Sequence, residues 1–266
     1  MTLAVCATPI GNLEDVTLRV LTELREADLV LAEDTRHTRA LLERHGIRAT
    51  LLSFHEHNEA ARIDEVLPRL AAGERIALVS DAGLPGLSDP GTRLVRAARD
   101  AGLDVTVLPG PSAAVTALVT SGLGDARFLF VGFLPRKEGE RRALWEELAP
   151  WDGVVVAYES PRRLPATLRS LALHDGDRQV AVCRELTKRF EEVVRGSAAE
   201  LADRFAEPPR GEITLVLGPS VPPADAGEAV RAVGELVAAG AARRTAADVV
   251  ARLTGTSRNE LYRRTL

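Results

Sequence analysis

Short apolar runs alternate with longer amphipathic segments through the N-terminal part of this 266-residue chain. The apolar runs are rich in leucine and β-branched residues, and each is followed by apolar residues at helical spacing. This alternation is typical of a mostly parallel sheet with helices on both faces, since successive parallel strands need a crossover helix. Strands are expected at 3–7, 29–32, 50–53, 75–79 and 104–108, and helices at 17–27, 35–45, 58–72 and 92–101.

Loops rich in glycine and proline follow three of the predicted strands. Residues 80–91 hold three glycines, two prolines and two aspartates, and similar loops begin at Thr8 and Pro109. Because the carboxyl ends of neighbouring parallel strands meet at one edge of a sheet, these loops together predict a ligand-binding crevice. The alternative is a set of tight connections without a ligand. Residues 88–91 are interpreted as the cap of the next helix.

A second block of alternating elements begins near Phe128. Strands are expected at 128–133, 154–158, 179–183, 191–196 and 213–217, with helices at 138–148, 161–173 and 198–205 and a linking helix at 112–124. Two of these strands are close enough in sequence to form a hairpin, so this sheet is predicted to be mixed. The helix at 161–173 would carry Pro161 in its first turn.

A linker at 219–225 precedes a helical C-terminal segment. Helices are expected at 228–239, 246–253 and 259–265, the last two joined by a short glycine turn with Ser257 as a cap, which is helix-turn-helix geometry. From Arg243 to Leu266 there are six arginines against Asp248 and Glu260. This segment is either a nucleic-acid-binding unit or a helical hairpin that only packs on the body or on a partner chain.

Charge and cysteine usage limit the classes of function. The net charge of −4 argues against a protein coated uniformly for nucleic acid, but leaves room for a local basic face. Cys6 and Cys183 lie in apolar strand-like runs and are expected to be core residues in a reducing compartment. Apolar runs stay well below the ~18 residues that cross a bilayer. With no secretory signal pattern in the sequence, we expect a cytoplasmic protein without membrane contact.

The first predicted strand is followed by Thr-Pro-Ile-Gly-Asn, where a dinucleotide fold would have Gly-x-Gly-x-x-Gly, and there is no Walker loop. The chain instead resembles the tetrapyrrole-methylase superfamily and, within it, the ribosomal RNA small subunit methyltransferase I group. The matching stretches are 7–15, 32–38, 53–59, 80–91, 108–114, 131–136, 158–164, 183–192 and 211–218, and residues 243–264 are similar to the helical C-terminal extension of that group.

This resemblance implies two α/β domains with an interdomain cleft, at 1–111 and 112–219, and a small basic helical extension at 226–266. It implies 2′-O-methylation of a cytidine ribose in the decoding region of 16S rRNA, with S-adenosyl-L-methionine as methyl donor. A homodimer acting on the small ribosomal subunit would be usual for the group. The alternatives are a methyltransferase of this fold with a tetrapyrrole or other small acceptor, and a ligand-sensing regulator that binds nucleic acid through the tail.

The resemblance also implies functional residues. Donor contacts carried over by position are Pro9, Ser80, Asp81, Ala82, Gly83, Leu84, Ser112, Ala113, Phe133, Glu159, Leu186, Glu212 and Ile213. Leu84 departs from the group, which usually has threonine there, so a hydroxyl contact at that point is in doubt. A ribose hydroxyl is a poor nucleophile, and a general base would help. Candidates for the base are Asp81, Asp34, Glu185 and Lys188.

Arginine clusters are the candidate RNA contacts. They are Arg36, Arg136, Lys137, Arg162, Arg163, Arg243, Arg244, Arg258, Arg263 and Arg264. Arg136 and Lys137, together with Arg141 and Arg142, either follow a phosphate backbone or form an exposed helix face. Glu33, Asp34, Arg36 and His37 either position the substrate or form a helix cap with a local ion pair. His55 and His57 have the spacing of a metal pair, but with no cysteine or third histidine nearby we expect no metal.

Overall fold

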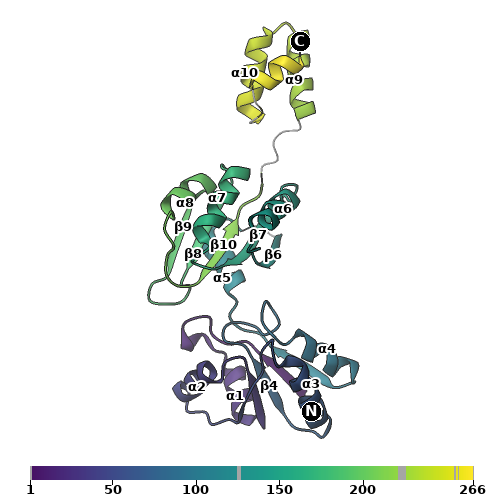
Figure 1. Ribbon diagram of the computed structural model, residues 1–266, viewed down its shortest axis with the longest axis vertical. Coiled ribbons are helices and arrows are strands. Elements are labelled where there is room, and N and C mark those ends of the chain that lie inside the picture. Colours follow the sequence, from purple (N-terminus) through teal and green to yellow (C-terminus); the bar gives the residue numbers. More distant parts are fainter. Residues whose placement is uncertain (1, 125–126, 221–225, 255, 257, 266) are drawn as a thin grey trace.

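The computed structural model describes residues 2–124, 127–220, 226–254, 256 and 258–265. Figure 1 shows three successive parts along the long axis of the molecule: a sheet with its helices at the N-terminal end, a second sheet in the middle, and three helices at the C-terminal end. The two sheets each have five strands. The junction between the sheets is the part of the fold that concerns function.

The first sheet is entirely parallel, as predicted. Its strand order is β3-β2-β4-β1-β5. The strands β1, β4 and β5, whose following loops were predicted to form a crevice, are therefore neighbours. The strands are β1 Thr2–Cys6, β2 Leu29–Ala32, β3 Leu51–Ser53, β4 Ile76–Val79 and β5 Asp104–Leu108. The sheet therefore brings their three carboxyl-terminal loops to one edge.

Helices cover both faces of this sheet. Alternate residues of β1 point to opposite sides: Ala4 and Cys6 pack with α1 and α2, whereas Leu3 and Val5 pack with α3 and α4. The helices are α1 Leu18–Glu26, α2 Thr35–Arg44, α3 Glu59–Ala71 and α4 Thr92–Asp100, with a short 3-10 turn η1 at Leu13–Asp15. Cys6 is a free, buried thiol, as expected of a core residue.

The second sheet is mixed, as predicted, with the order β6-β7-β10-β8-β9. β6 runs parallel to β7, and the other neighbours are antiparallel, including the β8–β9 hairpin. The strands are β6 Phe128–Phe133, β7 Val154–Glu159, β8 Gln179–Arg184, β9 Glu192–Ser197 and β10 Ile213–Leu217. β10 therefore lies between β7 and β8 and brings residues distant in sequence together.

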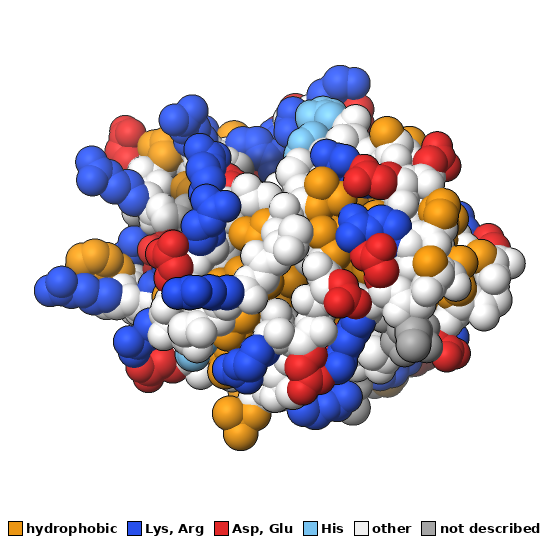
Figure 2. Space-filling model, turned by 90° about the horizontal axis from the view of Figure 1, so that it is seen from below, with side chains coloured by type: hydrophobic (Ala, Val, Ile, Leu, Met, Phe, Trp, Pro, Cys, Tyr) orange, Lys and Arg blue, Asp and Glu red, His pale blue; other side chains and the backbone are white. Residues whose placement is uncertain are grey.

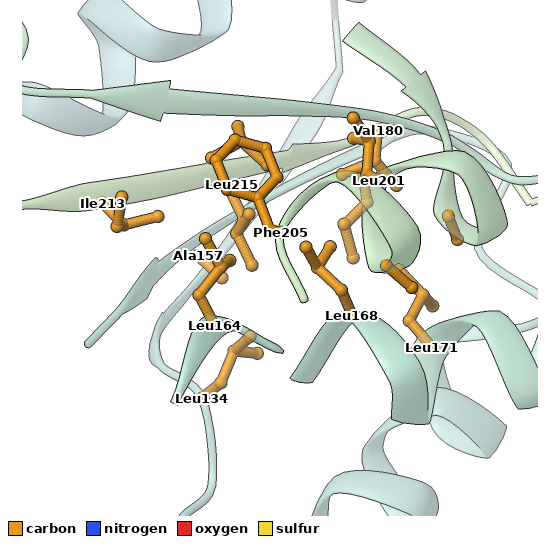
Figure 3. Packing of buried hydrophobic residues seen from close by; sticks show 14 of the residues in the cluster. Leu134, Ala157, Leu164, Leu168, Leu171, Val180, Leu201, Phe205, Ile213 and Leu215 are labelled. Carbon is orange, nitrogen blue, oxygen red and sulfur yellow. The ribbon is translucent and has the colours of Figure 1, made fainter. Parts of the chain in front are cut away.

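The two faces of this sheet have different covers. Helices α6 Glu138–Leu148, α7 Leu164–His174 and α8 Ala198–Arg204 cover one face, and Figure 3 shows Leu164, Leu168, Leu171 and Phe205 packed against Ala157 and Leu215 of the strands. Helix α5, Ala113–Ser121, covers the other face with Ala114, Ala117 and Leu118. The buried, free thiol of Cys183 lies under α5, as expected of a core residue.

One local expectation at a helix start was wrong, and a second was confirmed. The helix predicted from Pro161 begins at Leu164, and Pro165 occupies its first turn, because residues 160–163 form a separate turn closed by Arg163 N–H donating to Ser160 O. The expected cap at 88–91 is present, formed by backbone and not by a side chain: the N-cap of α4 is Gly91, with φ at 134°, and the Gly91 N–H donates to Glu59 Oε1 at 3.1 Å.

The C-terminal helices form a separate bundle. They are α9 Ala226–Ala238, α10 Arg243–Thr254 and α11 Arg258–Arg264, and they share their own apolar cluster, which includes Val233, Val250 and Leu261. The predicted glycine turn falls partly outside the described residues, and the Ser257 cap wholly so. No helix in the described part of the chain is long and apolar enough to span a membrane.

Candidate active site between the two sheets

A cavity of about 370 Å³ lies where the loops of the first sheet meet the second sheet. The loops after β1 and β4 are joined by two backbone hydrogen bonds between Thr8 and Gly83, at 2.8 and 3.1 Å, and Ala7 N–H donates to Leu108 O at the end of β5. Gly83 has φ at 77°, a conformation that glycine adopts without strain. The three loops therefore meet as the sequence predicted, and they form one wall of the cavity.

Most of the residues proposed as donor contacts line this cavity. Those present are Asp81, Ala82, Gly83, Leu84, Ser112, Ala113, Phe133, Glu159, Leu186, Glu212 and Ile213. Pro9 and Ser80 do not line it; they border a smaller hollow beside α2, where the Ser80 carbonyl accepts a hydrogen bond from the Thr8 hydroxyl at 3.0 Å. Both residues therefore lie behind the cavity wall and do not face the cavity itself.

Glu33, a candidate for positioning the substrate, also lines the cavity. Several further lining residues were not singled out as ligand contacts from the sequence: Ile10, Leu87, Ser88, Asp89, Tyr158, Ser160, Pro161, Cys183 and Thr214. Tyr158, Ser160 and Pro161 flank Glu159, and Cys183 and Thr214 are paired across β8 and β10, so their positions follow from the mixed sheet. Asp89 was expected to belong to the cap of α4. The N-cap itself is Gly91, whose N–H donates to Glu59, and Asp89 lies in the cavity lining.

The loop at 185–188 closes one side of the cavity and contacts the loop after β1. Thr187 Oγ1 accepts a hydrogen bond from Asn12 N–H at 3.0 Å, and Leu186 and Ile10 face the same space. Gly11 lies so close to this loop that a methyl group on it would be 2.9 Å from Leu186 O. Position 11 therefore requires glycine, because a larger side chain would collide with the loop at 185–188.

Lys188 and Glu185 do not fit the role of a general base. Lys188 Nζ lies 3.0 Å from Glu185 Oε1 and 2.8 Å from Glu212 Oε2. Burial opposes the charge on Lys188, but these two hydrogen bonds outweigh it and raise its pKa, so the amine stays protonated. Burial likewise acts against the Glu185 carboxylate, yet Lys188 and Glu212 N–H lower its pKa. Neither residue lines the cavity.

Asp34 is a helix cap with a local ion pair. Its carboxylate accepts from the Arg36 N–H at 2.8 Å and pairs with the Arg36 guanidinium at 2.6 Å. Hydrogen bonds from Arg36 lower the pKa of Asp34. Asp34 lies outside the cavity lining but touches it through its backbone, because its N–H donates to Asp81 Oδ1 at 3.0 Å. The carboxylate of Asp34 is therefore occupied at the start of α2.

Glu159 supplies the second sheet's buried charge at the cavity. Its side chain is fully buried, with Arg163 Nη2 2.6 Å from Oε1, and the Thr167 hydroxyl and Ser160 N–H also donate to it. Arg163 donates in addition to Leu134 O at 3.1 Å. The Arg163 guanidinium is therefore engaged with Glu159 and Leu134 O, and its role as an RNA contact stays a prediction. Buried Arg141 is likewise held by the carbonyls of Pro135 and Arg136.

The cavity lining is acidic on the side of the first sheet. Glu33, Asp81 and Asp89 all line it, and the described lining residues include no Lys, Arg or His. Burial, followed by repulsion from Glu33 and Asp81, raises the pKa of Asp89 to about 7. Burial and the charge on Asp81 also raise the pKa of Glu33. Such a lining suits a ligand with positive charge and apolar parts.

The remaining basic candidates are exposed on all three parts of the molecule. Arg36 lies on α2, Arg136, Lys137 and Arg162 on the second domain, and Arg244, Arg258, Arg263 and Arg264 on the C-terminal bundle, with Arg243 half-buried. Arg258 pairs with Asp248 at 3.2 Å. Figure 2 shows, on the face seen from the N-terminal end, that Lys and Arg side chains gather along one side.

His55 and His57 lie with their ring centroids 5.9 Å apart. His55 Nδ1 is buried without a hydrogen-bond partner. Within the residues that the structure describes, no group of three or more His, Cys, Asp or Glu side chains is placed to hold a metal ion. The pair is therefore a ring contact beside β3 in this structure.

The family described as Tetrapyrrole (Corrin/Porphyrin) Methylases matches residues 2–202 of the chain. A protein of Thermotoga maritima named ribosomal RNA small subunit methyltransferase I is 48% identical over 81% of this chain and 97% of its own length. A protein of the same name from Mesorhizobium japonicum is 44% identical over 98% of this chain and 90% of its own length.

Solved structures with the same fold carry the names of other methyltransferases. The uroporphyrin-III-C-methyltransferase of Thermus thermophilus superposes with a TM-score of 0.57 at 21% identity, covering 82% of this chain and 94% of its own. The methyltransferase CobJ has a TM-score of 0.62 at 21% identity, covering 83% of this chain and 94% of its own. At this level of identity the likeness concerns the fold.

Proposed function

Because this chain belongs to the tetrapyrrole (corrin/porphyrin) methylases, and within them to the ribosomal RNA small subunit methyltransferase I group, we propose that it methylates the 2′-hydroxyl of a cytidine ribose in the decoding region of 16S rRNA. The methyl donor is S-adenosyl-L-methionine. The observation that carries the proposal is the acidic, partly apolar cavity between the sheets, lined by most of the residues that the group's motifs place there.

The lining fits the donor in charge and polarity. A sulfonium and an ammonium group are both positive, and Asp81, Glu33 and Asp89 face the cavity without a cationic side chain among the described lining residues. Leu84, Leu186 and Ile213 supply apolar surface for an adenine ring. When bound, the donor supplies an electrophilic methyl group on a positively charged sulfur.

The protein's contribution to the reaction is mainly positioning. The loops after β1 and β4 are fixed by the Thr8–Gly83 hydrogen bonds, and Asp81 is fixed by Asp34 N–H. Holding donor and acceptor in line for displacement at the methyl carbon lowers the barrier without a covalent enzyme intermediate. Ile10 and Leu186 supply apolar surface on the side of the cavity where the loop after β1 meets the loop at 185–188.

The basic C-terminal bundle supports an RNA acceptor over a tetrapyrrole or other small acceptor, which has no evident use for it. The bundle has its own apolar cluster and exposes Arg244, Arg258, Arg263 and Arg264. A ligand-sensing regulator would also use such a unit, but would not need a donor cavity matched to methyltransferases. We propose that Arg36, Arg136, Lys137 and Arg162 extend the contact with the phosphate backbone.

The protein is further proposed to act in the cytoplasm on assembled or nearly assembled small subunits, as a homodimer. Apolar side chains exposed on α5 and on the edge strand β6 support pairing: Val119 is 75% and Phe128 40% exposed. Sedimentation velocity of the purified protein tests this part, and a monomer at micromolar concentration would contradict it.

Primer extension at limiting deoxynucleotide tests the function in the cell. Ribosomal RNA from a strain lacking this protein is expected to lose the ribose-methylation stop at the decoding-region cytidine, and the stop should return with the intact gene. A stop that persists in the deletion strain would refute the proposed acceptor. Loss of tetrapyrrole methylation in the same strain would favour the small-acceptor alternative instead.

A further inference from the structure

Five carboxylates line the cavity, and most of them are already bound by other groups. Glu159 is held by Arg163 and Thr167, and Glu212 by Lys188 at 2.8 Å. Asp81 accepts the Asp34 N–H. A carboxylate that is paired with a cation or fixed by a backbone N–H is a weak proton acceptor, because the bonds stabilise its charged form.

Asp89 differs from these residues in its partners. The Ser80 hydroxyl hydrogen-bonds to it, and within the described residues no Lys or Arg side chain pairs with it. Its carboxylate is half-buried and faces Glu33 and Asp81 from the first domain. Glu33 itself is held by Asp81 N–H. Like Glu33 and Asp81, Asp89 is thus a lining carboxylate with one hydrogen-bond partner and no paired cation among the described residues.

The loop that carries Asp89 also reaches the second domain. Ser88, with φ at 70°, precedes it, and the Ser88 hydroxyl lies against Gly132 of β6, where an added methyl group would be 3.3 Å away. Burial, followed by the charge of Asp89, raises the pKa of Tyr158 on β7. Asp89 therefore faces the space between the domains, where donor and acceptor must meet.

We propose that Asp89 is a catalytic residue that accepts the proton of the acceptor's ribose hydroxyl during methyl transfer. The inference rests on the proposed function. The hydroxyl oxygen forms a bond to the methyl carbon, the carbon–sulfur bond breaks, and its electron pair leaves sulfur as a neutral thioether. The hydroxyl proton passes to the Asp89 carboxylate and then to water, so charge and atoms balance.

The ionisation of Asp89 suits this role. Burial and the nearby charges of Glu33 and Asp81 raise its pKa to about 7, against the hydrogen bond from Ser80. A base is most effective when its pKa lies near the working pH. The positive charge of a bound donor will lower this pKa, so the rate of the loaded enzyme should titrate below 7.

The test is single-turnover methylation of small-subunit rRNA at saturating donor, followed across pH, with donor affinity measured by calorimetry. The wild-type rate should rise with pH to a plateau as Asp89 loses its proton. D89N should slow transfer on the order of 10²–10⁴-fold at saturating donor and abolish this rise, and a higher donor concentration should not restore the rate. D89E should recover part of the rate.

E33Q is the second variant and leaves Asp89 in place. Because it removes a like charge beside Asp89, the rise in rate should move to lower pH, which a purely structural role of Asp89 would not cause. A D89N enzyme with wild-type rate and pH profile, or one whose rate is restored by a higher donor concentration, would overturn the inference alone. A wild-type enzyme that methylates no ribose would overturn the proposed function and the inference with it.

Discussion

The Asp81 carboxylate accepts a hydrogen bond from the backbone N–H of Asp34, with Oδ1 and N 3.0 Å apart. The two residues follow β4 and β2, which are neighbours in the first sheet. This bond ties the loop that lines the cavity to the start of α2, whose first turn is in turn capped by the Asp34 side chain. Order in the donor-facing loop thus depends on a side chain that also faces the cavity.

Asp81→Ala is predicted to abolish methylation chiefly through loss of donor binding, since it removes both a cavity carboxylate and the bond to Asp34. Asp81→Asn retains an oxygen that can accept this N–H and should keep more of the affinity. Calorimetric titration with the donor distinguishes the two variants, with Asp100→Asn at the exposed end of α4 as control. Unchanged donor affinity in Asp81→Ala would overturn this assignment.

Gly11→Ala is predicted to weaken donor binding by displacing the loop at 185–188. The added methyl group would lie 2.8 Å from Thr187 Oγ1 and 2.9 Å from Leu186 O, and a backbone oxygen cannot rotate away. Overpacking of this kind costs about 1–3 kcal/mol. The free energy of donor binding should change by more than the free energy of unfolding does, because the strain is confined to a contact at the cavity wall.

Gly139→Ala in α6 is the matched control for this substitution. Nothing lies within 4 Å of the position that its methyl group would occupy, and its φ is not positive. Alanine in place of a helical glycine should stabilise the protein by up to about 1 kcal/mol and leave donor affinity unchanged. Equal donor affinities of the two variants would contradict the proposed close contact.

Arg163→Ala is predicted to destabilise the second domain by about 3 kcal/mol, because it leaves the fully buried Glu159 without its cation. The remaining donors, Thr167 and Ser160 N–H, keep the loss from being larger. Chemical denaturation followed by circular dichroism measures the change. Exposed Arg162→Ala should change stability little and serves as control, and equal stability of both variants would show that Glu159 does not need Arg163.

Removal of residues 226–266 is predicted to weaken binding of small-subunit rRNA while leaving donor binding intact. The bundle has a separate apolar cluster, so its removal exposes little of the two sheets. A cut at 241 would be less informative, because it would expose Ala229 and Val233 of α9. Filter binding with labelled RNA and calorimetry with the donor measure the two effects. Full RNA affinity in the truncated protein would mean that the bundle is structural.

The fold could be predicted from the sequence because its elements are locally consistent. β1, β4 and β5 are short, largely apolar runs followed by loops that contain glycine and proline. The hairpin of β8 and β9 follows from their closeness in the chain. Helix starts were less predictable where turn residues precede them. Pro161 suits a first helical turn as well as Pro165 does, and only the backbone hydrogen bond from Arg163 to Ser160 distinguishes them.

The site was predictable where function depends on backbone position, and less so where it depends on side-chain partners. The loop at Asp81–Leu84 lines the cavity because its strand ends there. Lys188 pairs with Glu212, which is distant in the chain and precedes β10. Glu159, the partner of Arg163, is only four residues away but ends β7, so the turn at 160–163 decides whether the two side chains meet. Asp89 escaped notice because a short polar residue before a helix is usually its cap.

Reconstituted methylation is the most direct test of the proposed 2′-O-methylation of 16S rRNA. Small subunits from a strain lacking this protein are incubated with the purified chain and isotopically labelled S-adenosyl-L-methionine, and their rRNA is digested to nucleosides for mass spectrometry. Labelled 2′-O-methylcytidine is expected in the decoding-region fragment. Label that appears only on a base, or no label in the RNA of a donor-binding enzyme, would contradict it.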